Sequence, residues 1–180
     1  HKGKPFLGME ALDITEVSGA DSLYEANGII AQSEANAGRL FGCRTFYSAE
    51  GSSQCIRAML YLLMLHAKRQ GRAPLIAAGR NAHKTFLTAA ALLDLEIRWL
   101  YPARGGGYLS CDLSPGELDA YLEEEKPDAV YLTSPDYLGH ISDIRALAEV
   151  CHKHGVLLAV DNAHGAYLRF LPEPLHPIGL

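Results

Sequence analysis

The sequence predicts an α/β fold in which a mainly parallel sheet lies between two layers of helices. Short apolar runs alternate with amphipathic stretches of helical period along much of the chain. Because helices separate the expected strands, right-handed crossovers and parallel pairing follow. Several of the apolar runs end in polar or charged residues, which is typical of a sheet with a ligand site at its carboxyl edge. We therefore expect a three-layer α/β/α sandwich.

Residues 1–27 are rich in turns and have weak periodicity, so we expect them to lie over the surface or against a partner subunit. Residues 28–180 are expected to form one partial domain. Its first strand is expected near Thr45. The further strands are expected at about 75–78, 96–101, 129–133 and 156–161. Helices are expected at about 28–41, 52–70, 83–93, 115–125 and 142–154.

The helix at 115–125 has the clearest start. Ser114 supplies a cap, Pro115 occupies the first helical position and Glu117 completes a capping box. At the other end of the domain, the sequence Cys151-His152-Lys153-His154 has the residue types of a metal site. Its position at the end of an amphipathic helix, before Gly155, instead predicts cations that complement the helix dipole, so no metal site is expected.

Composition excludes several function classes. The formal net charge is −5 and no basic run is present, which argues against nucleic-acid binding. No stretch has the length and apolarity of a membrane span, and we expect no signal peptide before the domain. The four cysteines form no CxxC pair, which favours a reduced, cytoplasmic protein. Because the first residue is His rather than Met, we expect the native amino terminus to be missing.

Three strand ends carry candidate functional groups. Asp161 follows the apolar run 156–160, where a carboxylate faces either a ligand or a turn that it caps. Ser52 and Ser53 follow Gly51 at the start of a helix, where hydroxyl groups, free N–H groups and the helix dipole favour a phosphate. The alternative there is an ordinary Ser N-cap. His83 follows the strand at 75–78, and a lone His at such a place is often only a satisfied surface or core group.

The chain resembles the large domain of the ornithine/lysine/arginine decarboxylases, which depend on pyridoxal phosphate. The resemblance rests on the order and spacing of short motifs along nearly the whole chain. These are His1-Lys2-Gly3, Asp13-Ile14-Thr15-Glu16-Val17, Gly51-Ser52-Ser53, Asn81-Ala82-His83-Lys84, Thr133-Ser134-Pro135-Asp136-Tyr137-Leu138-Gly139 and Asp161-Asn162-Ala163-His164-Gly165-Ala166. It implies a partial domain of the aspartate aminotransferase fold and decarboxylation of a small basic amino acid.

The resemblance also implies roles for individual residues. Asp161 would pair with the pyridine nitrogen and keep it protonated, and His83 would stack on the ring. Gly51, Ser52 and Ser53 would hold the phosphate, and Ala163 would lie under the other face of the ring. Ser134 and His164 are further candidates for cofactor contacts, although both are also explained as local backbone partners.

The family carries the lysine that binds the cofactor as a Schiff base in a Ser-x-His-Lys segment, and no such segment occurs before Leu180. Lys84 lies in the ring-stacking motif and does not match that position, so we expect the lysine to lie outside this chain. An aminotransferase, a β-eliminating lyase or a non-catalytic protein of this fold remain alternatives. The resemblance further implies a homodimer or higher homo-oligomer.

Overall fold

The structure is a computed structural model that describes residues 19–104, 107–173 and 175–178. The chain divides into two compact units, His1–Ser48 and Ala49–Leu180. Most of the segment expected to lie on the surface or against a subunit, residues 1–27, is outside the described residues. Its role therefore stays a prediction.

In the first unit, helix α2 spans Ile29–Phe41, close to the expected 28–41. Its start is held by Asp21, whose carboxylate accepts hydrogen bonds from the N–H groups of Gly28 at 3.0 Å and Ile30 at 2.7 Å. This cap lies several residues before the helix, which is why the sequence pattern did not reveal it. The helix ends at Gly42, whose φ of 74° is left-handed and suits glycine.

The strand expected near Thr45 is wrong, because residues 45–48 form no strand. Phe46 is 68% exposed, so the aromatic residues there do not mark a buried strand. Tyr47 is held by side chains of α2 instead. Its N–H donates to the Glu34 carboxylate at 2.7 Å, and its hydroxyl lies 2.7 Å from Ser33 Oγ.

The second unit is built on a parallel sheet that has four strands within the described residues. They are β1 (Leu75–Gly79), β2 (Glu96–Leu100), β3 (Ala129–Thr133) and β4 (Leu157–Asp161). Their order in the sheet is β2-β1-β3-β4. The register places Thr133 opposite Asp161 at the carboxyl ends of β3 and β4.

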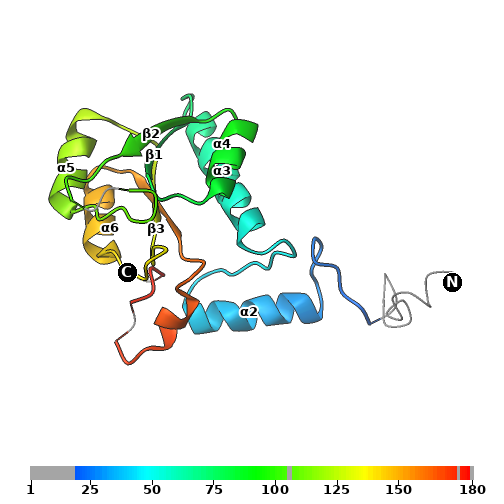
Figure 1. Cartoon of the computed structure of the whole chain (residues 1–180). Coiled ribbons are helices and arrows are strands. Elements are labelled where there is room, and N and C mark those ends of the chain that lie inside the picture. Colours follow the sequence, from blue (N-terminus) through cyan, green and yellow to red (C-terminus); the bar gives the residue numbers. More distant parts are fainter. Residues whose placement is uncertain (1–18, 105–106, 174, 179–180) are drawn as a thin grey trace, which may run out of the picture. The chain divides into compact units, whose positions relative to one another are not determined.

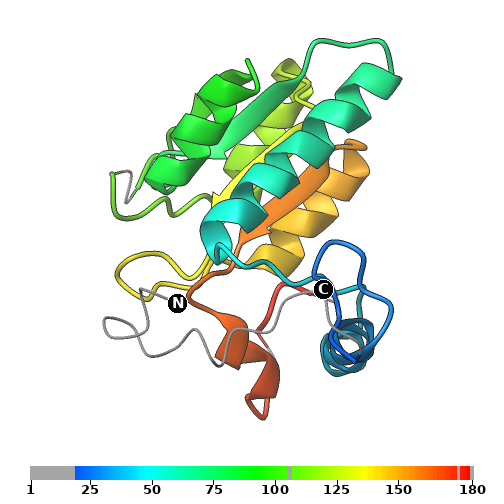
Figure 2. The same ribbon diagram turned by 90° about the vertical axis from the view of Figure 1, so that its right-hand side faces the viewer.

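Helices cover both faces of this sheet, as Figures 1 and 2 show. One face carries α3 (Ser52–Arg69) and α4 (Lys84–Leu92), and the other carries α5 (Pro115–Glu124) and α6 (Ile144–Lys153). The short 3-10 helix η1 (Ala166–Phe170) follows β4 and was not predicted. The expected three-layer α/β/α arrangement with a parallel sheet is confirmed.

Each helical layer packs on the sheet through its own core. The α3/α4 core includes Leu60, Ile76, Phe86 and Tyr131, all fully buried. The α5/α6 core includes Cys151, whose side chain therefore contributes to core packing. His154, at the end of α6, has its Nε2 2.6 Å from Oδ1 of Asp119. Among the residues that the structure describes, no helix combines the length and apolar character needed to cross a membrane.

Candidate functional site

Asp161 lies at the carboxyl end of β4 and is only 7% exposed. Since side chains alternate along a strand, Asp161 faces the same side of the sheet as Ala159, which belongs to the α3/α4 core. Its Oδ1 accepts a hydrogen bond from the N–H of Ala163 at 3.2 Å, and its Oδ2 accepts one from the hydroxyl of Tyr131 at 3.1 Å. The first bond is the local turn contact that the sequence allowed, whereas the second comes from the neighbouring strand.

Tyr131 lies in β3 and is fully buried. Its ring centroid is 4.3 Å from that of Phe86 on α4. Burial raises the pKa of the Tyr131 hydroxyl, and the negative charge of Asp161 raises it further. The hydroxyl therefore stays protonated at neutral pH and acts as a hydrogen-bond donor to the carboxylate.

His83 is the N-cap of α4, with Nδ1 accepting a hydrogen bond from the N–H of Thr85 at 3.2 Å. The hydroxyl of Thr85 lies 3.0 Å from His83 Nδ1 and 3.3 Å from Ser53 Oγ. Thr85 thus joins the starts of α3 and α4 and brings two predicted site residues together. Thr85 was not predicted as a site residue, since a buried Thr in the first turn of a helix carries no signal of its own.

Gly51 precedes α3 in its N-cap position and has a φ of 63°, which favours glycine. Because Gly51 is the N-cap residue and α3 begins at Ser52, Ser52 and Ser53 lie inside the first turn and neither is the N-cap. The positive end of the α3 helix dipole lies at this turn and favours an anion. The alternative of a Ser N-cap is therefore wrong, whereas phosphate binding by Gly51, Ser52 and Ser53 stays a prediction.

The remaining candidates differ in exposure. Ser134 is 1% exposed, and its Oγ accepts a hydrogen bond from the N–H of Ser142 at 3.1 Å, which is the local backbone role considered above. Ala163 and His164 are both exposed, and the His164 ring lies 6.2 Å from that of Tyr137. Cofactor contacts by these three residues stay predictions.

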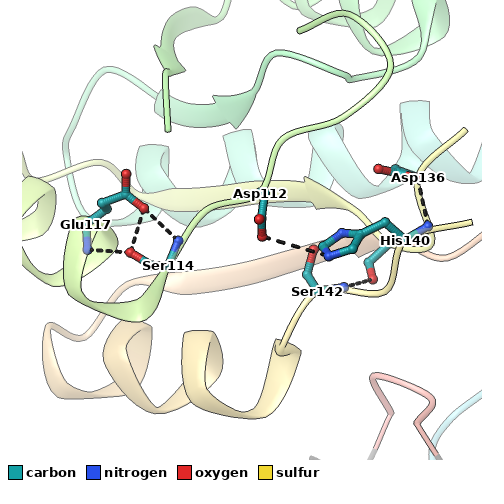
Figure 3. A network of polar contacts seen from close by, with 7 residues as sticks. Asp112, Ser114, Glu117, Asp136, His140 and Ser142 are labelled. Carbon is teal, nitrogen blue, oxygen red and sulfur yellow. Dashed lines mark hydrogen bonds and ion pairs between the residues drawn. The ribbon is translucent and has the colours of Figure 1, made fainter. Parts of the chain in front are cut away.

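The loop that follows β3 is held by Asp136, for which the sequence predicted no individual role. Its buried carboxylate accepts hydrogen bonds through Oδ1 from the N–H groups of Leu138 at 2.8 Å and His140 at 2.9 Å. Figure 3 shows this loop, with His140 Nε2 3.9 Å from Asp112 Oδ1. The polar network fixes the loop beside the end of β3.

The loops after β3 and β4 are also tied to each other. Asn162 donates a hydrogen bond from Nδ2 to the carbonyl oxygen of Ser134 at 2.6 Å. Gly165 packs so closely that an added Cβ would lie 2.6 Å from Cδ of Pro135. The segment around Asp161 therefore has little freedom to move relative to the end of β3.

Comparison with known proteins places this arrangement in a family. The profile described as "Orn/Lys/Arg decarboxylase, major domain" matches residues 4–179. The chain belongs to this family. A similar member by sequence is the arginine decarboxylase of Bacillus subtilis (strain 168), which is 29% identical over 178 residues, covering 94% of this chain and 34% of the relative. The chain thus spans about a third of the length of the curated relatives it matches.

Solved structures agree on the fold of this family member. Mouse CSAD superposes with a TM-score of 0.64 at 21% identity, covering 82% of this chain and 35% of that one. The structure of Oryza sativa TDC with PLP gives a TM-score of 0.60 at 16% identity and covers 83% and 38% of the two chains. At these identities the likeness concerns the fold alone.

Proposed function

We propose that the full-length protein is a pyridoxal-phosphate-dependent decarboxylase of a basic amino acid of the arginine, lysine or ornithine class. Membership of the Orn/Lys/Arg decarboxylase family supports the reaction and the substrate class. The observation that carries the proposal for this chain is the buried carboxylate of Asp161, which has one protein donor on each oxygen. Such a carboxylate at the carboxyl edge of a parallel sheet is suited to binding a protonated ring nitrogen.

The described residues fit pyridoxal phosphate. Asp161 would take the pyridine nitrogen, the turn at Gly51, Ser52 and Ser53 would take the phosphate, and His83 and Ala163 would lie on the two faces of the ring. An additional buried group, the hydroxyl of Thr133, lies opposite Asp161 on the neighbouring strand. Its Oγ1 has no hydrogen-bond partner within the described residues. A buried hydroxyl without a partner is costly, and a polar ligand next to it removes that cost.

When bound, pyridoxal phosphate supplies a ring that accepts the electrons released as a bond at the substrate α-carbon breaks. Asp161 holds a proton on the ring nitrogen, because a carboxylate next to a cation favours the charged form. Ser53 and the first turn of α3 anchor the phosphate and so orient the ring. The covalent lysine is proposed to lie outside these 180 residues.

The test is release of CO₂ by the purified full-length protein from arginine, lysine and ornithine, with and without added pyridoxal phosphate. We expect release from at least one of the three, and only with the cofactor. Amino transfer to a keto acid without CO₂ release would favour an aminotransferase. Cofactor binding with no turnover of any amino acid would favour a non-catalytic protein of this fold.

Replacement of both Ser52 and Ser53 by Ala is expected to raise the dissociation constant for pyridoxal phosphate roughly tenfold or more, as charge-assisted hydrogen bonds to the phosphate are lost. Fluorescence titration of the full-length apoprotein measures it. Thr88→Ala is the matched control, because Thr88 is exposed and its hydroxyl donates within α4, to the carbonyl of Thr85 at 3.0 Å. Unchanged affinity in the double variant would remove the phosphate role from this turn.

A cytoplasmic homodimer, or a larger homo-oligomer, completes the proposal. The segment 1–27 would lie against the neighbouring subunit, as its weak periodicity suggested. Sedimentation of the same full-length preparation tests the assembly, and an active monomer would contradict it.

A further inference from the structure

Resting on the proposed function, we infer that Tyr131 is a positioning residue for the ring nitrogen of the cofactor and acts through Asp161. The hydroxyl of Tyr131 donates to Oδ2 of Asp161 at 3.1 Å, between the adjacent strands β3 and β4. The N–H of Ala163 donates to the other oxygen at 3.2 Å. Two donors, one on each oxygen, hold the plane of the carboxylate. Each oxygen can accept a further bond, so acceptor capacity is left for a ligand N–H.

The Tyr131 hydroxyl is itself held in place by aromatic packing. The Tyr131 ring lies against Phe86 with centroids 4.3 Å apart, and Phe86 contacts Trp99 with centroids 6.0 Å apart. Tyr131 and Phe86 are both fully buried, which leaves the phenol ring no room to turn away. The orientation of the carboxylate is therefore set by the core between α4 and the sheet.

The direction of this hydrogen bond suits the proposed role. Burial raises the pKa of Tyr131, and the charge of Asp161 adds to that effect, so the phenol gives a hydrogen bond and keeps its proton. The carboxylate remains an acceptor on both oxygens. A protonated ring nitrogen binds best to an acceptor held in a fixed orientation, because charge-assisted hydrogen bonds depend on distance and alignment.

The test compares two ligands in the full-length apoprotein: pyridoxal phosphate, and its analogue with carbon in place of the ring nitrogen. In Tyr131→Phe we expect the dissociation constant for pyridoxal phosphate to rise roughly tenfold, the scale of one charge-assisted hydrogen bond. The dissociation constant for the carbon analogue should stay within about twofold, because that ligand has no N–H for Asp161 to hold. Fluorescence titration gives both constants without reference to activity.

Tyr121→Phe is the matched control. Tyr121 packs against the α5/α6 core on the opposite face of the sheet, and its buried hydroxyl has no hydrogen-bond partner among the described residues. Loss of the Tyr121 hydroxyl should change neither the dissociation constant for pyridoxal phosphate nor that for the carbon analogue. If Tyr131→Phe does not fold by circular dichroism, Tyr131→Met offers an apolar side chain that adapts to the same space and permits the same comparison.

Equal weakening of both ligands by the Tyr131 variant would show a purely structural role and overturn the inference. Unchanged affinity for pyridoxal phosphate would overturn it as well. Failure of the unmodified full-length protein to bind pyridoxal phosphate at all would instead overturn the proposed function, and the inference with it.

Discussion

Asp161→Asn in the full-length protein is expected to lower the kcat of decarboxylation roughly a hundredfold or more at saturating pyridoxal phosphate. Two donors face the carboxylate, the hydroxyl of Tyr131 and the N–H of Ala163. An amide has only one acceptor atom, so one of these donors loses its partner or meets an N–H group. The amide also lacks the negative charge that keeps the ring nitrogen protonated.

Steady-state CO₂ release with the cofactor in excess measures the effect of Asp161→Asn and separates it from cofactor affinity. Asp143→Asn is the matched control. Asp143 caps α6 by accepting a hydrogen bond from the N–H of Ala146 at 3.1 Å, and Asn caps a helix about as well as Asp. Parent-like turnover in the Asp161 variant would exclude this carboxylate from the reaction.

Phe86→Ala is expected to reduce the free energy of unfolding by about 3–5 kcal/mol. Phe86 is fully buried between Tyr131 and Trp99, so truncation removes a large apolar group and leaves a space that the sheet and α4 cannot easily close. Urea unfolding of the full-length protein, followed by circular dichroism, measures the change.

The control for Phe86→Ala is its neighbour in α4. Leu87 is 49% exposed, and Leu87→Ala should cost much less than Phe86→Ala. A similar loss in both variants would mean that burial at Phe86 is not the cause. A loss below about 1 kcal/mol at Phe86 would contradict the packing described for the α3/α4 core.

Local sequence signals predicted most of the second unit. The strand Ala129–Thr133 has the predicted bounds, and α5 begins with the predicted capping box between Ser114 and Glu117. Both features depend on residues that are close together in the sequence, so residue type and spacing were enough to predict them. The expected strand near Thr45 is absent because a short run with two aromatic residues does not show whether those side chains will be buried.

The contacts within the candidate site could not be predicted in the same way. Tyr131 and Asp161 are 30 residues apart, and Ser53 and Thr85 are 32 residues apart. Such pairs depend on strand register and on how two helices pack over one sheet, neither of which follows from the periodicity of a single element. The motifs therefore predicted Asp161, Ser53 and His83 as candidates, whereas the contacts of Tyr131 and Thr85 emerged only from the fold.

The hydroxyl of Thr85, shared between Ser53 and His83, means that the two positions are energetically coupled. A change at one of them alters the hydrogen-bonding environment of the other through a common partner. Free-energy effects of substitutions at Ser53 and His83 should therefore not sum, and a double-mutant cycle measures the coupling energy between the two positions. Anchoring of a phosphate and orientation of a ring would, in this protein, be one thermodynamic unit.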